Sequence, residues 1–348
     1  MMPGERPPEP RFVLAPMDGM THAGFRAVCF DYGADGATTE MIQSLAYGRA
    51  KKRMSPAFEE TLLRLPEERS LAAQLIGRDP GAMAESARRL TALARFDAIE
   101  INMGCPARKV VGSGNGSALL KEPDLAERIM AAVREATPLP VRLKIRLGWD
   151  SGHIVAPRLV QAAEQLGYES VTIHGRTRAQ MYTGAVDTGL LREICASARI
   201  PIYANGGVTC AADALDFLRD TGAAGVSIGR AALKQPWIFD DIRRLRRDES
   251  IPERLAPERI SLLVRLAERT CRCRPERVAI CEMRKFCSWW LSGLSGAEDI
   301  LSRLNGVDTL DGFRMLLGGY LNDLTRASDT RIHPELAAPY TLDTVYRT

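Results

Sequence analysis

Residues 99–106 read Ile-Glu-Ile-Asn-Met-Gly-Cys-Pro, an apolar strand pattern that breaks into a tight turn. The turn carries Cys105 between a glycine that tolerates positive φ and a proline that fixes φ, so the backbone bends sharply around the thiol. The loop that follows, residues 107–117, contains three further glycines, which suit a segment able to open and close. We interpret it as a catalytic loop that presents Cys105. A buried structural cysteine beside an ordinary surface loop is the alternative.

Outward from this stretch, a short apolar run followed by a longer helical pattern repeats along the chain. Eight candidate strands precede residue 230: 12–15, 37–40, 72–76, 98–102, 141–145, 170–173, 202–204 and 225–228. Polar residues fall just past many different strands, as expected when eight loops converge on one face of a barrel. An open, doubly wound sheet would concentrate them near one switch point. The pattern therefore predicts an α/β fold, a (β/α)8 TIM barrel.

The chain is longer than such a barrel requires, since its 348 residues exceed the ~250 typical of this fold. From about residue 236, helical patterns are continuous and strand-like runs are absent. We therefore predict a disordered N-terminal segment over residues 1–11, a catalytic barrel over 12–240, and a smaller all-helical domain over 241–348.

Positive charge is concentrated in the predicted helical domain. Residues 243–285 hold twelve Arg and one Lys against seven Asp or Glu, although the whole chain has a net charge of only +4. Two groups of arginines stand out: Arg243, Arg244, Arg246 and Arg247, then Arg272, Arg274 and Arg277. They favour a polyanion such as a nucleic acid, with Trp289 and Trp290 as nearby aromatic surface. A solvated helix face is the alternative.

The composition is that of a globular chain, with 45% apolar and 26% charged residues. The first eleven residues are rich in proline and charge and lack the apolar region of a signal peptide. No stretch approaches the ~18 uninterrupted apolar residues of a membrane span. We therefore expect a cytoplasmic protein with no membrane partner, whose eight cysteines are reduced.

Four cysteines gather in the predicted helical domain: Cys271, Cys273, Cys281 and Cys287. Their spacing lacks the paired C-x2-C units of zinc sites, and on helices these positions do not share one face. We predict that they pack between helices and hold no metal, with a metal or iron–sulfur cluster as the alternative.

Two glycine-containing segments suggest a phosphate site. Asn205-Gly206-Gly207 follows the seventh predicted strand, and Gly229-Arg230 follows the eighth. Barrels often bind phosphate at these two loops, where bare backbone N–H groups and an Arg fork can surround the anion. Ordinary turns are the alternative.

A cation is expected inside the barrel. Arg142, Lys144 and Arg146 alternate with apolar residues and so share one face of the fifth predicted strand. A cation in an interior needs an anionic partner, and the reduced form of a flavin is one. His174, directly after the sixth strand, could bond the same cofactor. A barrel salt bridge for Lys144 and a satisfied core imidazole for His174 are the alternatives.

Ordered motifs over nearly the whole chain resemble the tRNA-dihydrouridine synthase family, its bacterial B-type branch most closely. They include Leu14-Ala15-Pro16-Met17, Thr39-Glu40-Met41, Gln74-Leu75-Ile76-Gly77, Asn102-Met103-Gly104-Cys105-Pro106 with Lys109-Val110, and Gly116-Ser117-Ala118-Leu119-Leu120. Leu143-Lys144-Ile145-Arg146, His174-Gly175-Arg176-Thr177-Arg178 and Gly229-Arg230-Ala231-Ala232 continue the match.

The resemblance implies an FMN-dependent enzyme that uses NADPH to reduce uridine in the tRNA D-loop, with no obligatory protein partner. Hydride from flavin N5 would reach uracil C6, and Cys105 would protonate C5. The implied FMN contacts are Pro16, Met17, Gln74, Lys144, His174, Asn205, Gly206, Gly207, Gly229 and Arg230. The implied substrate and RNA contacts are Asn102, Lys109, Arg176, Arg178, Arg284 and Lys285, the last two in a helical tail that binds tRNA.

The chain departs from the family pattern at three places. The third position of Asn205-Gly206-Gly207 is commonly Asp in relatives, residues 111–115 have fewer basic side chains, and Phe286 replaces a histidine. An FMN barrel that reduces a free pyrimidine or an enone, a synthase acting on another RNA, and a flavin-bearing RNA chaperone are the rival hypotheses.

Overall fold

Eight parallel strands close into a barrel in the computed structural model, which describes residues 9–48 and 55–333. The strands are β1 (Arg11–Leu14), β2 (Gly36–Gln43), β3 (Leu71–Ile76), β4 (Ala98–Met103), β5 (Val141–Arg146), β6 (Ser170–His174), β7 (Ile202–Asn205) and β8 (Gly225–Ile228). They follow one another in chain order around the ring, and β1 pairs with β8. The predicted TIM barrel is confirmed, as is each of its strands.

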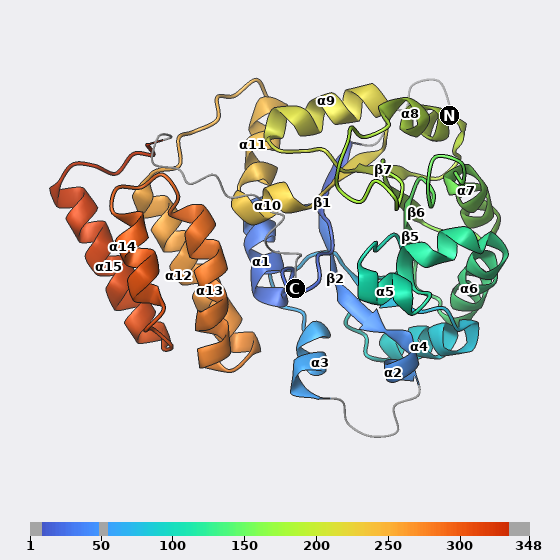
Figure 1. Cartoon of the computed structure of the whole chain (residues 1–348), viewed down its shortest axis with the longest axis horizontal. Helices are drawn as coiled ribbons and strands as arrows, with labels where there is room; N and C mark the ends of the chain where they lie inside the picture. Colours follow the sequence, from blue (N-terminus) through green and yellow to red (C-terminus); the bar gives the residue numbers. More distant parts are fainter. Residues whose placement is uncertain (1–8, 49–54, 334–348) are drawn as a thin grey trace.

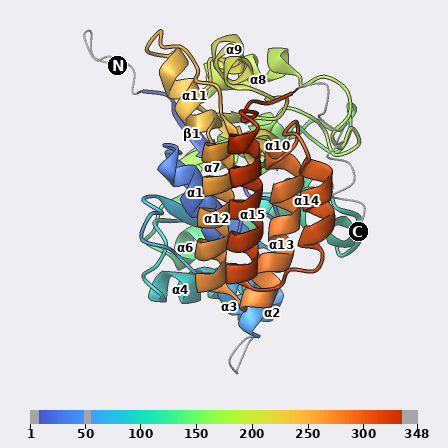
Figure 2. The ribbon, with the colours of Figure 1, turned by 90° about the vertical axis from the view of Figure 1, so that its left-hand side faces the viewer.

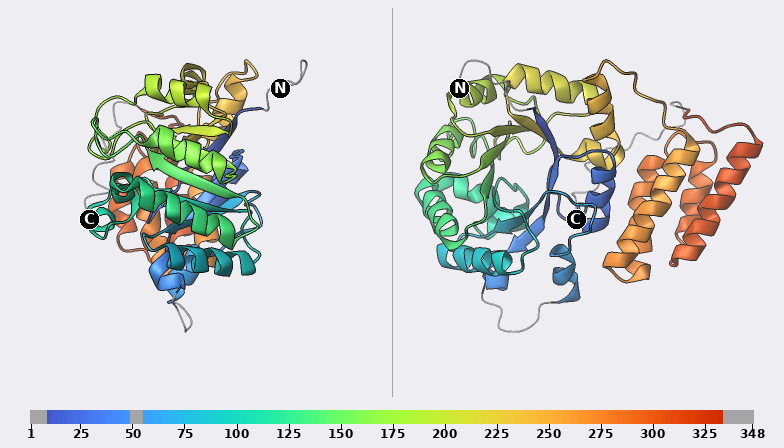
Figure 3. Two further views of the ribbon diagram at one scale, coloured as in Figure 1. Left: turned by 90° about the vertical axis from the view of Figure 1, so that its right-hand side faces the viewer. Right: turned by 180° about the vertical axis from the view of Figure 1, so that it is seen from behind.

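Helices surround the strands, as Figures 1 and 3 show. They are α1 (Ala23–Asp31), α2 (Ser44–Gly48), α3 (Pro56–Thr61), α4 (Pro80–Ala92), α5 (Arg108–Gly112), the 3-10 helix η1 (Gly116–Lys121), α6 (Pro123–Ala136), α7 (Ala156–Gln165), α8 (Thr188–Ser197), α9 (Ala211–Thr221), α10 (Arg230–Lys234) and α11 (Ile238–Leu245). Local signals set their ends. Asp79 caps α4 by accepting a 2.7 Å bond from the Ala82 amide, and Gly222 ends α9 in the left-handed conformation.

Strand β2 is longer than its apolar run predicts. It continues to Gln43, and its register against β3 shifts between Thr38 and Met41. The polar residues Thr39 and Glu40 conceal this extension, because they lie where the strand passes from the barrel wall to its mouth. We use the word mouth for the end of the barrel at which the strands have their carboxyl termini.

Helices α12 (Ala256–Cys273), α13 (Glu276–Trp290), α14 (Ala297–Leu304) and α15 (Leu310–Arg326) form a separate bundle. Figure 1 shows the bundle beside the barrel, and Figure 2 shows its helices in front of the barrel. The predicted all-helical character of this region is confirmed. The bundle meets the barrel where α12 crosses α1. Gly24 allows this crossing, since a Cβ there would lie 2.8 Å from Thr270 Oγ1.

The expected aromatic surface at Trp289 and Trp290 is wrong. Both side chains are buried, and Trp290 Nε1 donates to the Leu233 carbonyl of α10 at 2.8 Å. The rings of Trp290 and Trp237 lie 6.4 Å apart. Apolar area on a helix that packs against a barrel is removed from water, so Trp290 joins the two parts of the molecule.

Several arginines of the basic region also form ion pairs inside the molecule. Arg243 pairs with Asp35 at 2.5 Å, and Arg274 pairs with Glu60 of α3 at 3.1 Å. Part of the positive charge that the sequence suggests for binding a polyanion is thus neutralised by carboxylates of the same chain. Residues 1–8 of the predicted disordered segment and residues 334–348 of the predicted helical domain lie outside the described residues.

Candidate functional site at the mouth of the barrel

Cys105 lies on a loop that is fixed at both ends. The amides of Gly104 and Cys105 donate to Asn102 Oδ1 at 3.0 and 2.9 Å. The Cys105 carbonyl accepts bonds from the Ser117 amide at 3.0 Å and the Ser117 hydroxyl at 2.9 Å. Gly116 has a φ of +59°, and a Cβ there would lie 2.8 Å from the same carbonyl. These contacts hold the thiol at the end of β4.

The environment keeps the Cys105 thiol in its acid form. Burial raises the pKa of Cys105 above its ordinary value, and the nearby charge of Asp18 acts in the same direction. Arg146 and Lys144 oppose this effect to a smaller extent. At neutral pH the group is therefore a protonated thiol, not a thiolate.

Asn102 belongs to a chain of polar side chains inside the barrel. Its Nδ2 donates to Gln74 Oε1 at 2.9 Å, and Gln74 Nε2 donates to Glu100 Oε1 at 2.6 Å. Burial raises the pKa of Glu100. Asn102 Nδ2 and Oδ1 are both hydrogen-bonded within the protein. The structural role of Asn102 is therefore to position the Cys105 loop.

Lys144 places a cation in the barrel interior. Its Nζ donates to Asn205 Oδ1 at 3.0 Å, across β6 to β7, and Asn205 Nδ2 donates to the Ser227 carbonyl at 2.7 Å. Burial lowers the pKa of Lys144 to about 8, against an opposing contribution from Glu100. Arg142, on the same strand, instead pairs with Glu169.

His174 is a neutral imidazole at the mouth. Burial, followed by the charges of Arg146 and Lys144, lowers the pKa of His174 well below its ordinary value. Arg176 Nη1 lies 3.3 Å from His174 Nε2, and the Arg176 guanidinium also donates to the Gly184 carbonyl at 2.9 Å. Arg176 is buried, so it ties the loop after β6 to the site.

The loop after β7 approaches this imidazole closely. Gly206 and Gly207 have φ of +110° and +79°. A Cβ on Gly206 would lie 2.8 Å from the His174 ring. Glycine is therefore required here both for the backbone conformation and for the space.

Tyr182 was missed by sequence reasoning, yet it lies among the charged groups of the site. Its ring centroid is 5.4 Å from Arg146 Cζ, 4.8 Å from Arg230 Cζ and 6.2 Å from the His174 ring. The available signal was that Tyr182 is the only aromatic residue between positions 175 and 190.

Arg146 was also left out of the predicted site. Its side chain donates to the Gly104 carbonyl at 3.0 Å and to the Met181 carbonyl at 2.7 Å. These bonds join the Cys105 loop to the loop after β6.

The other predicted residues are divided between the mouth and its surroundings. Met17 lies beside the loop after β8, because a Cβ on Gly229 would be 3.6 Å from Met17 Sδ. Pro16 precedes it, and Lys109 is exposed on α5. On α13, Lys285 Nζ donates to the Gly19 carbonyl at 3.3 Å and Arg284 donates to the Asn305 carbonyl at 3.0 Å. Of these two, Lys285 is thus placed against the loop after β1.

The described residues contain no group of three or more Cys, His, Asp or Glu side chains that could hold a metal. Within that part of the chain there is also no helix with the length and apolar character needed to cross a membrane. Cys273 and Cys287 are buried, and Cys271 and Cys281 are half-buried.

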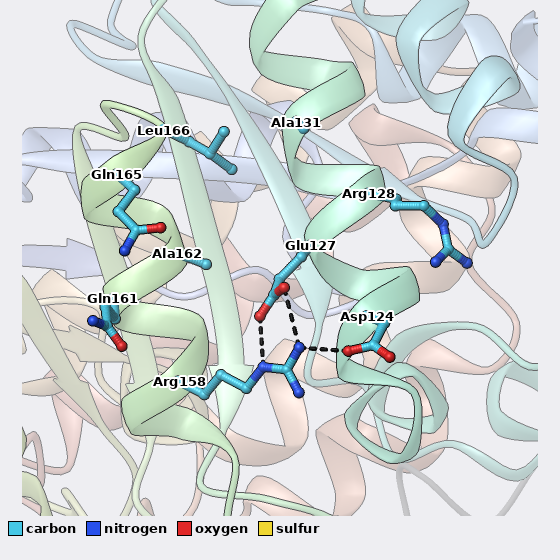
Figure 4. Close-up of a pocket in the computed structure, with 9 residues that line it drawn as sticks. All are labelled: Asp124, Glu127, Arg128, Ala131, Arg158, Gln161, Ala162, Gln165 and Leu166. Carbon is cyan, nitrogen blue, oxygen red and sulfur yellow. Dashed lines mark hydrogen bonds and ion pairs between the residues drawn. The ribbon is translucent and has the colours of Figure 1, made fainter.

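A surface groove between α6 and α7, shown in Figure 4, is separate from the mouth. Arg158 crosses it to bond Glu127 at 2.6 Å and Asp124 at 2.5 Å. These charges neutralise one another, whereas the mouth gathers a protonated thiol, a neutral imidazole and several cations. We therefore place the functional site at the mouth.

Comparisons with known proteins identify the family of this chain. A family model described as dihydrouridine synthase (Dus) matches residues 13–317. The tRNA-dihydrouridine synthase B of Pseudomonas aeruginosa is 35% identical over 304 residues, 86% of this chain and 90% of that protein. A probable tRNA-dihydrouridine synthase of Rhodobacter capsulatus is 42% identical over 230 residues, 66% of this chain and 69% of that protein.

Among solved structures, histamine dehydrogenase from Rhizobium sp. 4-9 is similar to this chain with a TM-score of 0.51 and 11% identity. The likeness covers 74% of this chain and 48% of that one, so this chain spans about half of the other's length. At this identity the likeness concerns the barrel fold alone. The family match over most of the length, together with the relatives above, shows that the chain belongs to the dihydrouridine synthase family.

Proposed function

We propose that this chain reduces uridine to 5,6-dihydrouridine in tRNA, with FMN as its bound cofactor and NADPH as the reductant. The observation that carries the proposal is the protonated Cys105 thiol, held on the same barrel mouth as Lys144 and His174. Relatives named as tRNA-dihydrouridine synthases support tRNA as the substrate.

The residues at the mouth fit FMN by their chemistry. Lys144 supplies a cation that contacts an amide, not a carboxylate, and so remains available to an anionic ring. The bare backbone at Gly206 and Gly207, the loop of Gly229 and the guanidinium of Arg230 suit a phosphate. Pro16, Met17, Gln74, His174 and Asn205 complete the proposed cofactor contacts. Bound and reduced, FMN would supply the hydride that adds to uracil C6.

The chain's own part in the chemistry is proton donation. Addition of hydride at C6 leaves negative charge that is relieved when C5 gains a proton. Cys105 gives its thiol proton to C5 and regains one from solvent between turnovers. Asn102 and Ser117 keep the thiol in place through their bonds to the loop.

The substrate must present one base to this mouth. A uridine in a folded RNA has to leave its stack before it can lie over a flavin, so the rest of the RNA needs its own contacts. We assign that contact surface to Lys109, Arg178, Arg284 and Lys285, and to a helical domain that starts near residue 241. Buried Arg176 would then act on RNA only through the loop that it holds.

The test is position-resolved mapping of dihydrouridine in total tRNA and rRNA from a strain that lacks the gene. Complementation with wild type should restore dihydrouridine at defined positions of the D-loop. Cys105→Ala should not restore it, because loss of a general acid typically slows a reaction by about 10²- to 10⁴-fold. Cys210→Ala is the matched control, since that thiol is exposed at the start of α9.

Other outcomes would redirect the assignment. Dihydrouridine that is lost only from rRNA would mean a synthase acting on another RNA. Unchanged maps together with turnover of a free pyrimidine or enone would favour the small-molecule enzyme. Full function of Cys105→Ala would favour a flavin-bearing RNA chaperone.

A further inference from the structure

Trp149 lies close to two cations on the rim of the mouth. Lys121 Nζ is 4.5 Å from its ring centroid, and Arg178 Cζ is 4.6 Å from the same point. Cation–π contacts of this kind attract a cation to the face of the ring. They restrict two long side chains that would otherwise be free to move.

The three residues come from three successive loops of the barrel. Lys121 ends η1, Trp149 follows β5, and Arg178 follows β6. Backbone bonds fix their arrangement, because the Arg178 amide donates to the Gly148 carbonyl at 2.9 Å and the Ala179 amide donates to the Trp149 carbonyl at 2.8 Å.

These loops are also the ones that carry the chemistry. At its other end, η1 supplies Ser117, which bonds the Cys105 carbonyl. Arg178 lies two residues after Arg176, which contacts His174. The group of Lys121, Trp149 and Arg178, which we call the rim cluster, is therefore joined directly to the reacting site.

The positive charge of the rim cluster is not neutralised. Within residues 9–48 and 55–333, neither Lys121 nor Arg178 forms an ion pair, and Arg178 Nε is buried without a hydrogen-bond partner. The neighbouring carboxylates are occupied elsewhere. Glu122 pairs with Arg78 at 3.2 Å and Asp150 pairs with His153 at 2.7 Å.

This state contrasts with that of two arginines of the basic region. Arg243 and Arg274 pair with barrel carboxylates. The rim cluster thus offers free cations at fixed positions, beside the place where a base would enter.

We propose that the rim cluster binds backbone phosphate of the RNA next to the reacting uridine. Resting on the proposed function, this inference adds a specific contact surface to it, with Trp149 as the residue that positions both cations. Contacts to phosphate fix the register of a nucleic acid without reading its sequence, which suits a rim that must bring one uridine to Cys105. Preorganised cations also lose less side-chain entropy when the anion binds.

The test measures tRNA affinity of the FMN-loaded full chain against salt concentration, for Lys121→Gln, Arg178→Gln and Trp149→Leu. Each glutamine variant should bind tRNA about three- to tenfold more weakly at moderate salt. Each should also reduce the slope of log K against log salt by about 0.7 to 0.9, the value for one lost phosphate contact. Trp149→Leu should lose affinity although both cations remain, and Trp149→Phe should recover most of it.

The matched control is Arg128→Gln, which removes one exposed cation from α6 on the outer surface (Figure 4). It should leave tRNA affinity and the salt slope at wild-type values. The inference is overturned if the rim variants behave like Arg128→Gln. It is also overturned if their defect is confined to flavin reduction by NADPH, because the phosphate would then belong to the dinucleotide.

Two further measurements distinguish loss of RNA contacts from loss of the fold. Thermal unfolding and FMN content identify a variant that has lost its fold, and the two glutamine variants test the idea without Trp149→Leu. A wild-type protein that forms no dihydrouridine in tRNA would refute the proposed function itself. An active wild type with rim variants of unchanged tRNA affinity would refute only the rim cluster.

Discussion

At the mouth, burial shifts the pKa values of single residues more than their charged or hydrogen-bonding partners do. Lys144 is a cation that donates a hydrogen bond to an amide oxygen, and burial lowers its pKa to about 8. Cys105 is shifted in the other direction, toward the neutral thiol. At neutral pH the same interior thus holds Lys144 mostly as an ammonium and Cys105 as a neutral thiol. These are the protonation states that their proposed roles need.

The shifted pKa of Lys144 leads to a prediction on cofactor affinity. The ammonium form exists below the pKa, so FMN binding should be strongest below about pH 8. If the cation contributes most of the binding, affinity should fall about tenfold by one unit above that pKa. Titration of FMN fluorescence against pH measures this decrease.

Two variants control the experiment. Lys144→Met should bind FMN weakly without the decrease near pH 8, and Lys144→Arg should keep its affinity through that range, because arginine stays charged. Equal pH dependence in wild type and Lys144→Met would contradict the assignment of the titrating group.

Sequence alone could predict the site residues that follow strands directly. Cys105, Lys144 and His174 occupy fixed places relative to an apolar run, and a barrel brings all such places to one mouth. Tyr182 could not be found in this way. Its position depends on how residues 175–187 fold back over Arg146, which loop composition does not specify.

At the scale of elements, the crossing of α1 and α12 shows how one residue sets a packing distance. A Cβ on Gly24 would lie 2.8 Å from Thr270 Oγ1 and 3.1 Å from the Thr270 amide nitrogen. The second of these atoms is backbone, so the helix itself would have to move. Gly319 of α15 is the opposite case, with no atom within 4 Å of the same position.

These two helical glycines predict opposite effects of the same substitution. Gly24→Ala should lower the free energy of unfolding by about 1–3 kcal/mol, the usual cost of an overpacked contact. Gly319→Ala should raise it by about 0.5–1 kcal/mol, because alanine favours the helix. Urea denaturation of both variants measures the difference, and a change of the same sign in both would refute the role of Gly24.

Strands could be predicted from the sequence where their apolar pattern is not interrupted by polar residues. All eight strands were predicted, but the predicted β2 ended at Glu40, because the polar residues Thr39 and Glu40 interrupt the apolar pattern before Met41 and Ile42. The wrong expectation for Trp289 and Trp290 has a similar cause. An aromatic pair within a basic stretch of sequence suggests an exposed surface, because the sequence does not show that the pair is buried in the folded molecule.

For the whole molecule, ion pairs formed by a buried arginine hold the helical bundle against the barrel. Arg269 of α12 bonds Asp31 of α1 through both oxygens, at 2.6 and 3.0 Å, and also contacts Glu67 at 3.1 Å. The guanidinium is buried, with its Nε unpartnered among the described residues. Removal of this one side chain would leave two carboxylates at the boundary without their main partner.

Arg269→Met should therefore lower the free energy of unfolding by about 2 kcal/mol, since hydrogen bonds to charged groups contribute about 1.5–3 kcal/mol. Faster amide hydrogen exchange in α1 and α12 should accompany the loss. The control is Arg303→Met on α14, whose pair with Asp299 is exposed and should cost about 1 kcal/mol or less. Similar losses in the two variants would show that the boundary does not depend on Arg269.

Closure of the barrel by β1 and β8 also has a consequence for synthesis. The paired strands are separated by more than 200 residues of chain. A ribosome that adds ~5–20 residues per second needs roughly 10 to 40 s to pass from one to the other. Throughout that interval the nascent chain carries β1 as an unpaired edge, a state that invites incorrect pairing. Because the loops of Met17 and Gly229 meet only at closure, the proposed FMN site cannot be complete before translation has passed β8.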